Sequence, residues 1–580
     1  MAKDWIIQPP HDTCTPLAAR WNVPPIVAQL LLNRGITTDG DARAFINPQL
    51  RNLHAPEELP GVRQAASIVI DALRRHDKIV LYGDYDVDGI AAVAILWHLL
   101  DAAGAPPGFY VPHRLEEGYG LNSSAIRNIA ADGARLLVTV DCGIGAVAEA
   151  KVAAECGLRL VITDHHAPGK AIPECQAIVH PTVGGEYANP SICGAGVAFK
   201  LAWAIAQQLS GSEKVAPQFR ERLFGLVPLV ALGTIADVVP LLGENRIFAR
   251  HGLATLKDTT NPGLIALMES AGLTGANVSG YDVGFKLAPR LNAVGRMGHA
   301  RLAVEMLTRA DAARAAEIAE YLEKHNRARQ AEERRIFFDA CQKIEQHRLD
   351  SDACRGIVLA SEKWHAGVIG IVAARVVERF GRPTVLIAVD KGMGQGSARS
   401  IPPFLMHEAL VTCGEHLLQH GGHAMAAGLR IDPARIPQFS EAFVQVANNR
   451  LSGADIRPKL RLDAEVGLGE LDLTCVGAML NLGPFGQGNP APKFATSWVD
   501  LEGEPRLMGK KSEHLSAIFR DGGARLRCVA FGRAAMESPL KDARRCRIAF
   551  EPTINEFNGN RTVEVHALDF QFHGAEAAPV

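Results

Sequence analysis

Residues 78–96, KIVLYGDYDVDGIAAVAIL, place the strongest constraint on the fold. The apolar run Ile79–Tyr82 is typical of a buried strand, and Ala91–Leu100 has the composition of a helix. Three carboxylates at alternate positions lie between them: Asp84, Asp86 and Asp88. Like charges this close repel one another, and a divalent cation usually holds them together. The segment therefore predicts a strand, a metal-binding turn and a helix.

The pattern D-x-D-x-D-G also begins a calcium-binding EF-hand loop. That loop needs a Glu eleven residues after its first Asp, where this chain has Ile95. It also needs an entering helix, whereas a strand enters here. We expect a catalytic metal site, and a solvated acidic turn is the remaining alternative.

Strands and helices alternate beyond this segment. Further strands are expected at Leu136–Val140, Leu160–Thr163 and Ala177–His180. Alanine-rich helical segments, including Ala146–Glu155 and Val197–Leu209, separate them. This alternation predicts an α/β domain whose parallel sheet has helices on both faces.

Polar residues follow successive strands of the predicted sheet. Asp141 comes directly after Leu136–Val140, and Asp164-His165-His166 follows Leu160–Thr163. Ligands bind at the carboxyl ends of strands in such sheets, so these side chains should meet at one edge. Asp237 stands alone in an apolar helical stretch, where a carboxylate is costly unless it is paired or bound to metal. A capping or hydrogen-bonded role in the core is the alternative for Asp237.

Oxygen and imidazole donors of this kind suit Mn²⁺ or Mg²⁺ better than structural zinc. Five or more such groups at one edge could hold two ions roughly 4 Å apart, which suits phosphoryl displacement. Adjacent residues point in different directions. One of His165 and His166 can therefore bind metal while the other donates to a phosphate oxygen.

The motifs GDYDVDG (83–89), VDCG (140–143), DHH (164–166) and the Asp237 segment resemble, in this order, the four motifs of the DHH phosphoesterase family. The resemblance implies metal ligands and catalytic groups at the matching positions. The implied ligands are Asp84, Asp86, Asp88, Asp141, His165 and Asp237. His166, with Asp141 and His165, is the implied catalytic group, as a ligand or a donor to the transition state.

One departure limits this transfer. Family members that act on pyrophosphate carry a His where this chain has Tyr82. Which of Asp84 and Asp86 binds metal directly is therefore left open by the sequence.

Two further motifs resemble the branch of single-strand-specific exonucleases within the family. They are RLEEGYGLN (114–122) and PRLNAVGR (289–296). The resemblance implies that basic and polar side chains in them bind substrate: Arg114, Tyr119, Arg290, Asn292 and Arg296.

The chain beyond residue 300 divides by composition. Residues 301–350 are rich in Ala, Glu, Arg and Lys, which predicts one or two long connecting helices. Residues 351–455 resemble the DHH-associated domain, a second α/β domain that faces the metal site across a cleft in the family. Glycines beside His and Arg suit phosphate binding, although they could serve tight packing instead. The candidate substrate-binding residues here are His365, Ser397, Arg399 and His423.

Residues 456–580 contain short alternating runs typical of a small β-barrel. Between residues 506 and 547 there are 11 Lys or Arg and 4 Asp or Glu, a net charge of +7 in a chain of −2. Basic barrels commonly bind single strands, and the resemblance implies an OB-fold. The candidate nucleic-acid-binding residues are Lys510, Lys511, Arg525 and Arg527.

With 580 residues, the chain should hold three or four domains of about 150 residues. We expect a lead-in at 1–72, a catalytic domain at 73–300, the connector at 301–350, the second domain at 351–455 and the barrel at 456–580. The 11 cysteines include no C-x-x-C pair, so no disulfide framework is indicated. No signal peptide and no apolar run of about 18 residues is found, which predicts a cytoplasmic protein without a membrane span.

These patterns together predict a metal-dependent exonuclease that hydrolyses single-stranded DNA to mononucleotides. Its 5′→3′ polarity, its role in repair and recombination, and possible partners (single-strand-binding protein and a helicase) come from the resemblance alone. We expect a monomer. A small-molecule phosphodiesterase is an alternative, but it would not need the basic barrel. A non-catalytic scaffold is another, but it would be expected to have lost metal carboxylates.

Overall fold

The computed structural model describes residues 3–113, 117–118, 120–297 and 299–572, and the side chains of 296 and 297 lie outside the description. The chain forms two compact units. Unit 1 comprises residues 1–10, 327–473 and 492–580. Unit 2, the catalytic unit, comprises residues 11–326 and 474–491.

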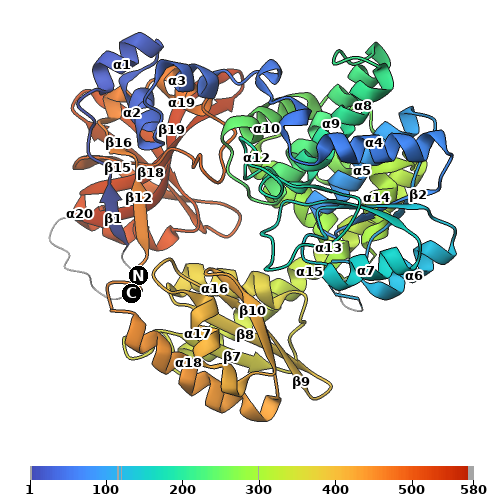
Figure 1. Ribbon diagram of the computed structural model, residues 1–580. Coiled ribbons are helices and arrows are strands. Elements are labelled where there is room, and N and C mark those ends of the chain that lie inside the picture. Colours follow the sequence, from blue (N-terminus) through green and yellow to red (C-terminus); the bar gives the residue numbers. More distant parts are fainter. Residues whose placement is uncertain (1–2, 114–116, 119, 298, 573–580) are drawn as a thin grey trace. The chain divides into compact units, whose positions relative to one another are not determined.

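A five-stranded sheet organises the catalytic unit (Figure 1). Its strand order is β3-β2-β4-β5-β6, and every neighbouring pair is parallel. The strands are β2 (Ile79–Gly83), β3 (Gly108–Tyr110), β4 (Leu136–Val140), β5 (Arg159–Thr163) and β6 (Ala177–Val179). The four strands expected from the sequence are present, and β3 is an additional short strand at the edge. The predicted parallel α/β sheet is confirmed.

Helix α5 (Val87–Ala102) forms the centre of the core beside this sheet. It is apolar around its whole circumference, which is typical of a helix enclosed on all sides. It packs against α8 (Gly194–Ser210), α9 (Pro217–Ala236) and α14 (Ala300–Thr308). Because only three residues separate the end of β2 from the start of α5, the burial of α5 also fixes the turn that carries the first carboxylates.

Other helices complete the catalytic unit. They are α1 (Cys14–Trp21), α2 (Pro25–Asn33), α3 (Asp39–Ile46), α4 (Val62–Arg74), α6 (Ser123–Ala131), α7 (Val147–Glu155), α10 (Gly243–Leu256), α11 (Pro262–Ser270), α12 (Gly280–Asp282) and α13 (Ala288–Met297). A π-helical turn, η3 (Val283–Leu287), joins α12 to α13. The predicted connector is α14 followed by α15 (Ala312–Gln346), a helix that runs from the catalytic unit into unit 1.

The first part of unit 1 is the second α/β domain. Its sheet has the order β10-β11-β9-β8-β7, in which only β7 and β8 are parallel. The strands are β7 (Ile357–Ser361), β8 (Thr384–Asp390), β9 (Met393–Arg399), β10 (Gln419–Gly422) and β11 (Ala426–Ile431). The helices are α16 (Ile369–Phe380), α17 (Met406–Thr412) and α18 (Ile436–Arg450).

The C-terminal domain is a closed barrel. Strands β15 (Val499–Met508), β16 (His514–Asp521), β17 (Ala524–Ala530), β19 (Asn560–Phe572) and β18 (Arg545–Phe557) pair in this order, and β18 also pairs with β15. Five strands closed in this way, with one parallel pair between β17 and β19, form an OB-fold. The predicted barrel is confirmed.

Residues near the N-terminus also contribute to unit 1. Strand β1 (Asp4–Ile7) pairs in parallel with β12 (Lys459–Leu462), and Trp5 donates a hydrogen bond to Asp569 at 2.9 Å. No pattern in the sequence indicates this pairing, because it joins segments more than 450 residues apart.

A segment of the C-terminal part, residues 474–491, belongs to the catalytic unit. Arg246 on α10 is buried, and its guanidinium donates to the carbonyl oxygens of Phe45, Leu482 and Gly483 at 2.7–3.1 Å. The backbone amide of Leu241 donates to the carbonyl oxygen of Gln487 at 2.8 Å. These contacts fix the segment to the chain that follows Asp237.

We expect Arg246→Ala to lower the free energy of unfolding by about 3 kcal/mol, because three buried carbonyl groups lose their donor. Thermal and urea unfolding of the full chain would measure the change. Arg220→Ala, at an exposed position of α9, should change stability by less than about 0.5 kcal/mol. Equal effects of the two substitutions would contradict the structural role of Arg246.

Candidate metal centre

Aspartates follow three neighbouring strands of the catalytic sheet at matching positions. Gly83, Val140 and Thr163, which end β2, β4 and β5, are register partners across the sheet. The next residue in each case is an aspartate: Asp84, Asp141 and Asp164. All three are buried. Parallel pairing therefore brings carboxylates that are far apart in sequence to one edge.

The first motif forms the N-terminus of α5. Asp86 is its N-cap, and one carboxylate oxygen accepts from the backbone amides of Asp88 and Gly89 at 3.0 and 3.1 Å. The carboxylate of Asp88 accepts from the amides of Gly194 and Ala195 at 2.6 and 2.9 Å. Asp88 thus connects the N-terminus of α5 to the N-terminus of α8 at the candidate metal centre.

His165 lies among three carboxylates. Its Nε2 is 3.0 Å from Asp141 Oδ1, and 3.7 Å from both Asp88 Oδ2 and Asp237 Oδ2. Asp237 is the C-cap of α9, so the end of that helix brings the fourth motif to the site. The buried atoms Asp141 Oδ1 and His165 Nε2 form no hydrogen bond with described residues. This is the arrangement expected of metal ligands.

Three overlapping groups of donor atoms, each within 4.8 Å, could hold an ion. The groups are Asp141, His165 and His166; Asp88, His165 and Asp237; and Asp84, Asp86 and Asp141. All six predicted ligands occur in these groups, and both Asp84 and Asp86 occur in the third. Because Asp141 and His165 are shared between groups, the donor set fits two adjacent ions.

Two glycines, which the sequence analysis did not single out, leave room for the closely spaced carboxylates of Asp141 and Asp88. A Cβ at Gly194 would lie 2.4 Å from Asp141 Oδ1, and one at Gly233 would lie 2.3 Å from Asp88 Oδ1. Any side chain at these positions would displace a carboxylate. Asp141 itself has φ +61°, and Val238, which follows Asp237, has φ +58°. Left-handed backbone at non-glycine residues is strained and is often found at functional sites.

Burial and mutual repulsion disfavour negative charge at this edge. Burial, followed by the charges of Asp88, Asp86, Asp84 and Asp164, raises the pKa of Asp141 well above its usual range. Burial and Asp88 likewise raise the pKa of Asp86. Burial, with Asp88 and Asp86, raises the pKa of Asp237 to about 8. A divalent cation would reverse these shifts, so the electrostatics of the site also fit a metal.

The two adjacent histidines differ in environment. Burial lowers the pKa of His165, which keeps its ring neutral and able to bind a metal. His166 is more exposed, and its Nδ1 lies 2.8 Å from Asp164 Oδ1. Burial opposes its charge, but the hydrogen bond to Asp164 and the charges of Asp164, Asp237 and Asp84 together outweigh burial and raise the pKa of His166 to about 9. His166 is therefore a cation near neutral pH.

Asp164 positions this edge, although the sequence did not place it among the site residues. Its carboxylate also accepts from the backbone amides of Ile144, His165 and His166 at 2.8–3.1 Å. Burial by itself would raise the pKa of Asp164. The hydrogen bond to His166 and the charge of that ring act in the opposite direction, and the resulting pKa of Asp164 lies below its usual range. In the sequence, the feature that could have indicated Asp164 is its position directly after a predicted strand.

Tyr82 turns away from the ligands. Its hydroxyl donates to the carbonyl oxygen of Gly120 at 3.0 Å, and its ring packs 5.1 Å from that of Tyr110. Tyr82, the position at which the sequence departs from the expected motif, is thus part of the core.

The predicted substrate-binding residues of the catalytic unit are only partly described. Asn292 Oδ1 accepts from the amide of Val87 at 3.2 Å, so it supports the first turn of α5. Arg290 lies 2.9 Å from Glu323 and donates to the carbonyl oxygens of Lys286 and Ser270, so its guanidinium is already held by internal contacts. Arg114, Tyr119 and the side chain of Arg296 lie outside the described residues.

The four predicted substrate-binding residues of the second domain gather near one end of its sheet. Arg399 Nη1 lies 3.1 Å from Ser397 Oγ. A Cβ added to Gly370 would contact both of these side chains, so both lie against the first turn of α16. His365 precedes this helix, and its carbonyl oxygen accepts from the amide of Ile369. The amide of His423 donates to Ala426, the register partner of Arg399. A helix N-terminus with an arginine beside it suits an anion.

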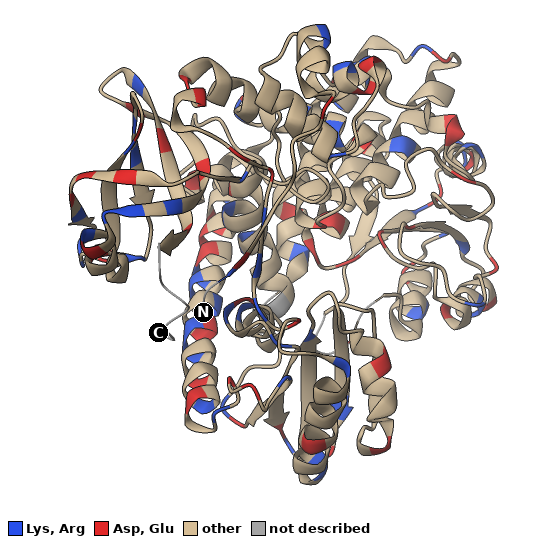
Figure 2. Ribbon diagram, turned by 90° about the vertical axis from the view of Figure 1, so that its left-hand side faces the viewer, with Lys and Arg blue, Asp and Glu red and all other residues tan. Residues whose placement is uncertain are grey.

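The basic stretch of the barrel is largely ion-paired. Arg525 lies 3.1 Å from Glu502, and Arg527 lies 3.4 Å from Glu564. Lys510 and Lys511 lie in the exposed turn between β15 and β16 and form no ion pair with described residues. Basic and acidic residues are interspersed over the ribbon as a whole (Figure 2). Phe519 and Phe550 are core residues, whereas Phe531 and Phe557 are exposed.

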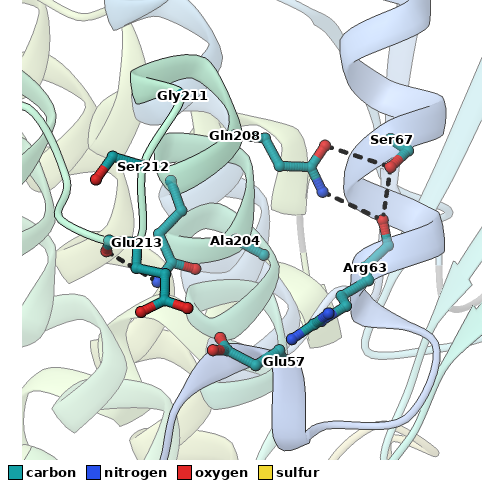
Figure 3. A pocket seen from close by; sticks show the side chains of 9 residues that line it. Glu57, Arg63, Ser67, Ala204, Gln208, Gly211, Ser212 and Glu213 are labelled. Atoms are coloured by element: carbon teal, nitrogen blue, oxygen red, sulfur yellow. Dashed lines mark hydrogen bonds between the residues drawn. The ribbon is translucent and has the colours of Figure 1, made fainter.

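A separate hollow of about 470 Å³ lies between α4 and the end of α8 (Figure 3). Glu57, Arg63 and Gln208 line it, and Gln208 is hydrogen-bonded to Ser67 and to the carbonyl oxygen of Arg63. None of its lining residues belongs to the metal-binding groups.

Among the described residues, no helix is both long enough and apolar enough to span a membrane.

Comparison with known domain families defines the class of protein. Residues 78–231 match the N-terminal domain of the DHH family, residues 355–449 match the DHHA1 domain, and residues 462–569 match the RecJ OB domain. The predicted DHH fold, DHH-associated domain and OB-fold are thus confirmed.

Curated relatives that match most of this chain are named single-stranded-DNA-specific exonuclease RecJ. The Bacillus subtilis protein is 37% identical over 97% of this chain and 70% of its own length, and the Dickeya dadantii protein is 34% identical over 94% and 95%. Crystal structures of Thermus thermophilus RecJ with Mn²⁺ and with Mg²⁺ match 99% of this chain, and 80% and 78% of theirs, at 32% and 30% identity with TM-scores of 0.83 and 0.77. The chain belongs to the RecJ family of DHH phosphoesterases.

The raised pKa values predict that metal binding releases protons. With its pKa near 8, Asp237 is mostly protonated at pH 7 in the metal-free site and must lose its proton to bind Mn²⁺. Calorimetric titration of Mn²⁺ at pH 7 in buffers of different ionisation enthalpy should show net proton release. Asp237→Asn should weaken binding at least 10-fold and reduce the number of protons released.

In the metal-free protein, the raised pKa of Asp237 predicts that Asp237→Asn is stabilising. When folding raises the pKa of a carboxyl, the folded state loses stability as the pH rises from about 4 to about 8. Asp237→Asn should therefore stabilise the metal-free protein by roughly 1–3 kcal/mol at pH 8 and by much less at pH 4. Destabilisation at pH 8 would contradict the assigned repulsion.

Proposed function

We propose that this chain is a metal-dependent exonuclease that hydrolyses single-stranded DNA from the 5′ end to mononucleotides. The observation that carries the proposal is the convergence of Asp141 and His165 with two further groups of carboxylates at one buried sheet edge. Membership of the RecJ family, whose members are named for this activity, supplies the substrate. The retained ligands argue against a non-catalytic scaffold.

Asp84, Asp86, Asp88, Asp141, His165 and Asp237 would hold Mn²⁺ or Mg²⁺, the ions named in the Thermus thermophilus structures. When bound, two ions supply a water of lowered pKa and neutralise charge on the phosphate. Asp88 is already held by two backbone amides, so it is rigid before any ligand arrives. A rigid donor set is what positions reacting groups without further reorganisation.

His166 would stabilise the transition state. Asp164 holds its Nδ1, so its Nε2 is left to donate a charge-assisted hydrogen bond to a phosphate oxygen. The exposure of His166 leaves the ring accessible to substrate, whereas His165 beside it is largely covered. The two histidines therefore divide metal binding and charge stabilisation.

Supporting residues would position the strand. We include in the proposal Arg114, Tyr119, Asn292 and Arg296 of the catalytic unit, and His365, Ser397, Arg399 and His423 of the second domain. Arg290 would act through the contacts it makes with Glu323 and Ser270. In the barrel, Lys510 and Lys511 are better placed than Arg525 and Arg527, which have acidic partners.

The domain boundaries predicted from the sequence also remain part of the proposal, as do a cytoplasmic location, a monomeric state, a role in repair and recombination, and action with single-strand-binding protein and a helicase.

An end-label assay tests the function. With Mn²⁺ or Mg²⁺, a 5′-labelled single-stranded oligonucleotide should release labelled mononucleotide early, whereas a 3′-labelled one should give progressively shorter labelled strands. Asp141→Asn should lower the rate at least 10³-fold, and a blunt duplex should resist. Early mononucleotide from the 3′ label would reverse the polarity, and cleavage restricted to dinucleotides would favour a small-substrate phosphodiesterase.

The charge of His166 predicts a distinct pH dependence. Although burial opposes its charge, the hydrogen bond and the charge of Asp164 raise the pKa of His166, so the activity that depends on its charge should be present near neutral pH and lost at alkaline pH. His166→Gln should lower kcat by about 10²–10³ with little change in KM, as loss of a donor to developing charge does. It should also remove the alkaline limb of the kcat profile. Weakened Mn²⁺ binding in this variant would instead assign His166 as a ligand.

A further inference from the structure

Asn245 lies directly before Arg246 on α10 and is buried, although it belongs to none of the three metal-binding groups. Its side-chain amide forms three hydrogen bonds. The Nδ2 atom donates to the carbonyl oxygens of Ser191 and Pro240 at 2.7 and 3.1 Å, and the Oδ1 atom accepts from Asn189 Nδ2 at 2.9 Å. One carboxamide therefore links α10 to two loops that are remote from each other in sequence.

The first of these loops connects Asp237 to α10. Asp237 is the C-cap of α9, and Pro240 follows it by three residues. The four residues from Asp237 to Pro240 are each half-buried or exposed, so packing of their side chains does little to fix the loop. Asn245 holds the carbonyl oxygen of Pro240, and the amide of the next residue, Leu241, donates to the carbonyl oxygen of Gln487. These two contacts therefore support the loop that carries Asp237.

The second loop leads into α8. Ser191 precedes the first residue of this helix, Gly194, by three positions. The amides of Gly194 and Ala195 donate to the carboxylate of Asp88. A Cβ at Gly194 would lie 2.4 Å from Asp141 Oδ1. A shift of this loop would therefore move the helix N-terminus that holds one candidate ligand and lies against another.

The end of α9 and the start of α8 also contact each other. The Sγ atom of Cys193, the N-cap of α8, lies 3.4 Å from Oγ1 of Thr234 on α9. A Cβ at Gly233 would lie 2.7 Å from the Cβ of Ala195. The two loops that Asn245 joins therefore belong to one packed arrangement, in which two helix ends bring their ligands to the same site.

We propose that Asn245 is a positioning residue for the metal centre, and that it sets the separation of Asp237 and Asp88 by bonding both loops to one side chain. The inference rests on the proposed function and adds a residue that acts through others, since the buried amide is occupied by its three internal partners. Residues that orient metal ligands from outside contribute about 10–100-fold to metal affinity. Because Asn245 acts through the backbone beside the ligands, the lower end of this range is expected.

Metal affinity separates this role from a contribution to folding alone. Mn²⁺ would be titrated by calorimetry into the metal-free full chain at pH 7, at a temperature at which circular dichroism shows every variant folded. Asn245→Ala should weaken Mn²⁺ binding about 10-fold, because both carbonyl oxygens lose their donor and the two loops are free to separate. Urea unfolding of the metal-free protein would be measured in parallel.

Asn261→Ala is the matched control. Asn261 is the N-cap of α11, where its side chain accepts from the amide of Leu264, and its Nδ2 donates to the carbonyl oxygen of Leu307 at 2.9 Å. It therefore also joins two segments of the catalytic unit, but neither segment carries a member of the three metal-binding groups. This variant should be less stable than the wild type, yet its Mn²⁺ affinity should stay within about 2-fold of the wild-type value.

A double-substitution cycle tests the route of the effect. If Asn245 acts by placing Asp237, then Asn245→Ala should weaken Mn²⁺ binding less than about 3-fold in a chain that already carries Asp237→Asn. Equal weakening with and without Asp237→Asn would overturn the positioning role, as would equal losses of affinity in Asn245→Ala and Asn261→Ala.

A milder variant keeps the test decisive if Asn245→Ala does not fold. Asn189→Ala removes only the donor to Asn245 Oδ1, at a half-buried position, and should weaken Mn²⁺ binding about 3-fold. Unchanged affinity in that variant would then overturn the proposal. If the wild type binds Mn²⁺ and cleaves single strands while these variants bind Mn²⁺ equally well, only the positioning role is wrong. If the wild type binds no Mn²⁺, the proposed function fails and the positioning role fails with it.

Discussion

Repulsion among buried carboxylates at one edge of a parallel sheet is the constraint on which this structure depends. Asp84 and Asp141 follow register-paired strand ends, and Asp88 and Asp237 come from helix termini that close over them. Burial and neighbouring charges raise the pKa of Asp141 and Asp86. The fold tolerates this cost because backbone amides stabilise Asp86 and Asp88, and because cations can neutralise the remainder.

The same edge gives two adjacent histidines different chemistry. His165 is buried among carboxylates and stays neutral, which suits coordination. His166 is tied to Asp164 and carries a charge, which suits a phosphate oxygen. Asp164 can play this part because three backbone amides already fix its carboxylate. Asp164, which belongs to none of the three donor groups, therefore determines the orientation and charge of the neighbouring ring.

Support for the site extends to distant parts of the chain. Residues 474–491 lie in the catalytic unit, where buried Arg246 holds the carbonyl oxygens of Leu482 and Gly483. The amide of Leu241, four residues after Asp237, is bonded to Gln487 of the same segment. Part of the C-terminal region thus contacts the loop that follows Asp237, a candidate metal ligand, while the rest forms the OB-fold.

The sequence by itself determined the parallel sheet, the order of its strands along the chain, the six candidate ligands and the barrel. The sheet and the barrel follow from local signals, namely apolar runs of strand length and helical composition, whereas the full set of six candidate ligands follows from the resemblance to the DHH motifs. It could not determine which groups share a metal, that Asp164 orients His166, or that Gly194 and Gly233 must lack side chains. It also could not show that Arg525 and Arg527 have acidic partners, or that β1 pairs with β12. Those properties depend on distances between residues that are remote in sequence, and only tertiary packing sets such distances.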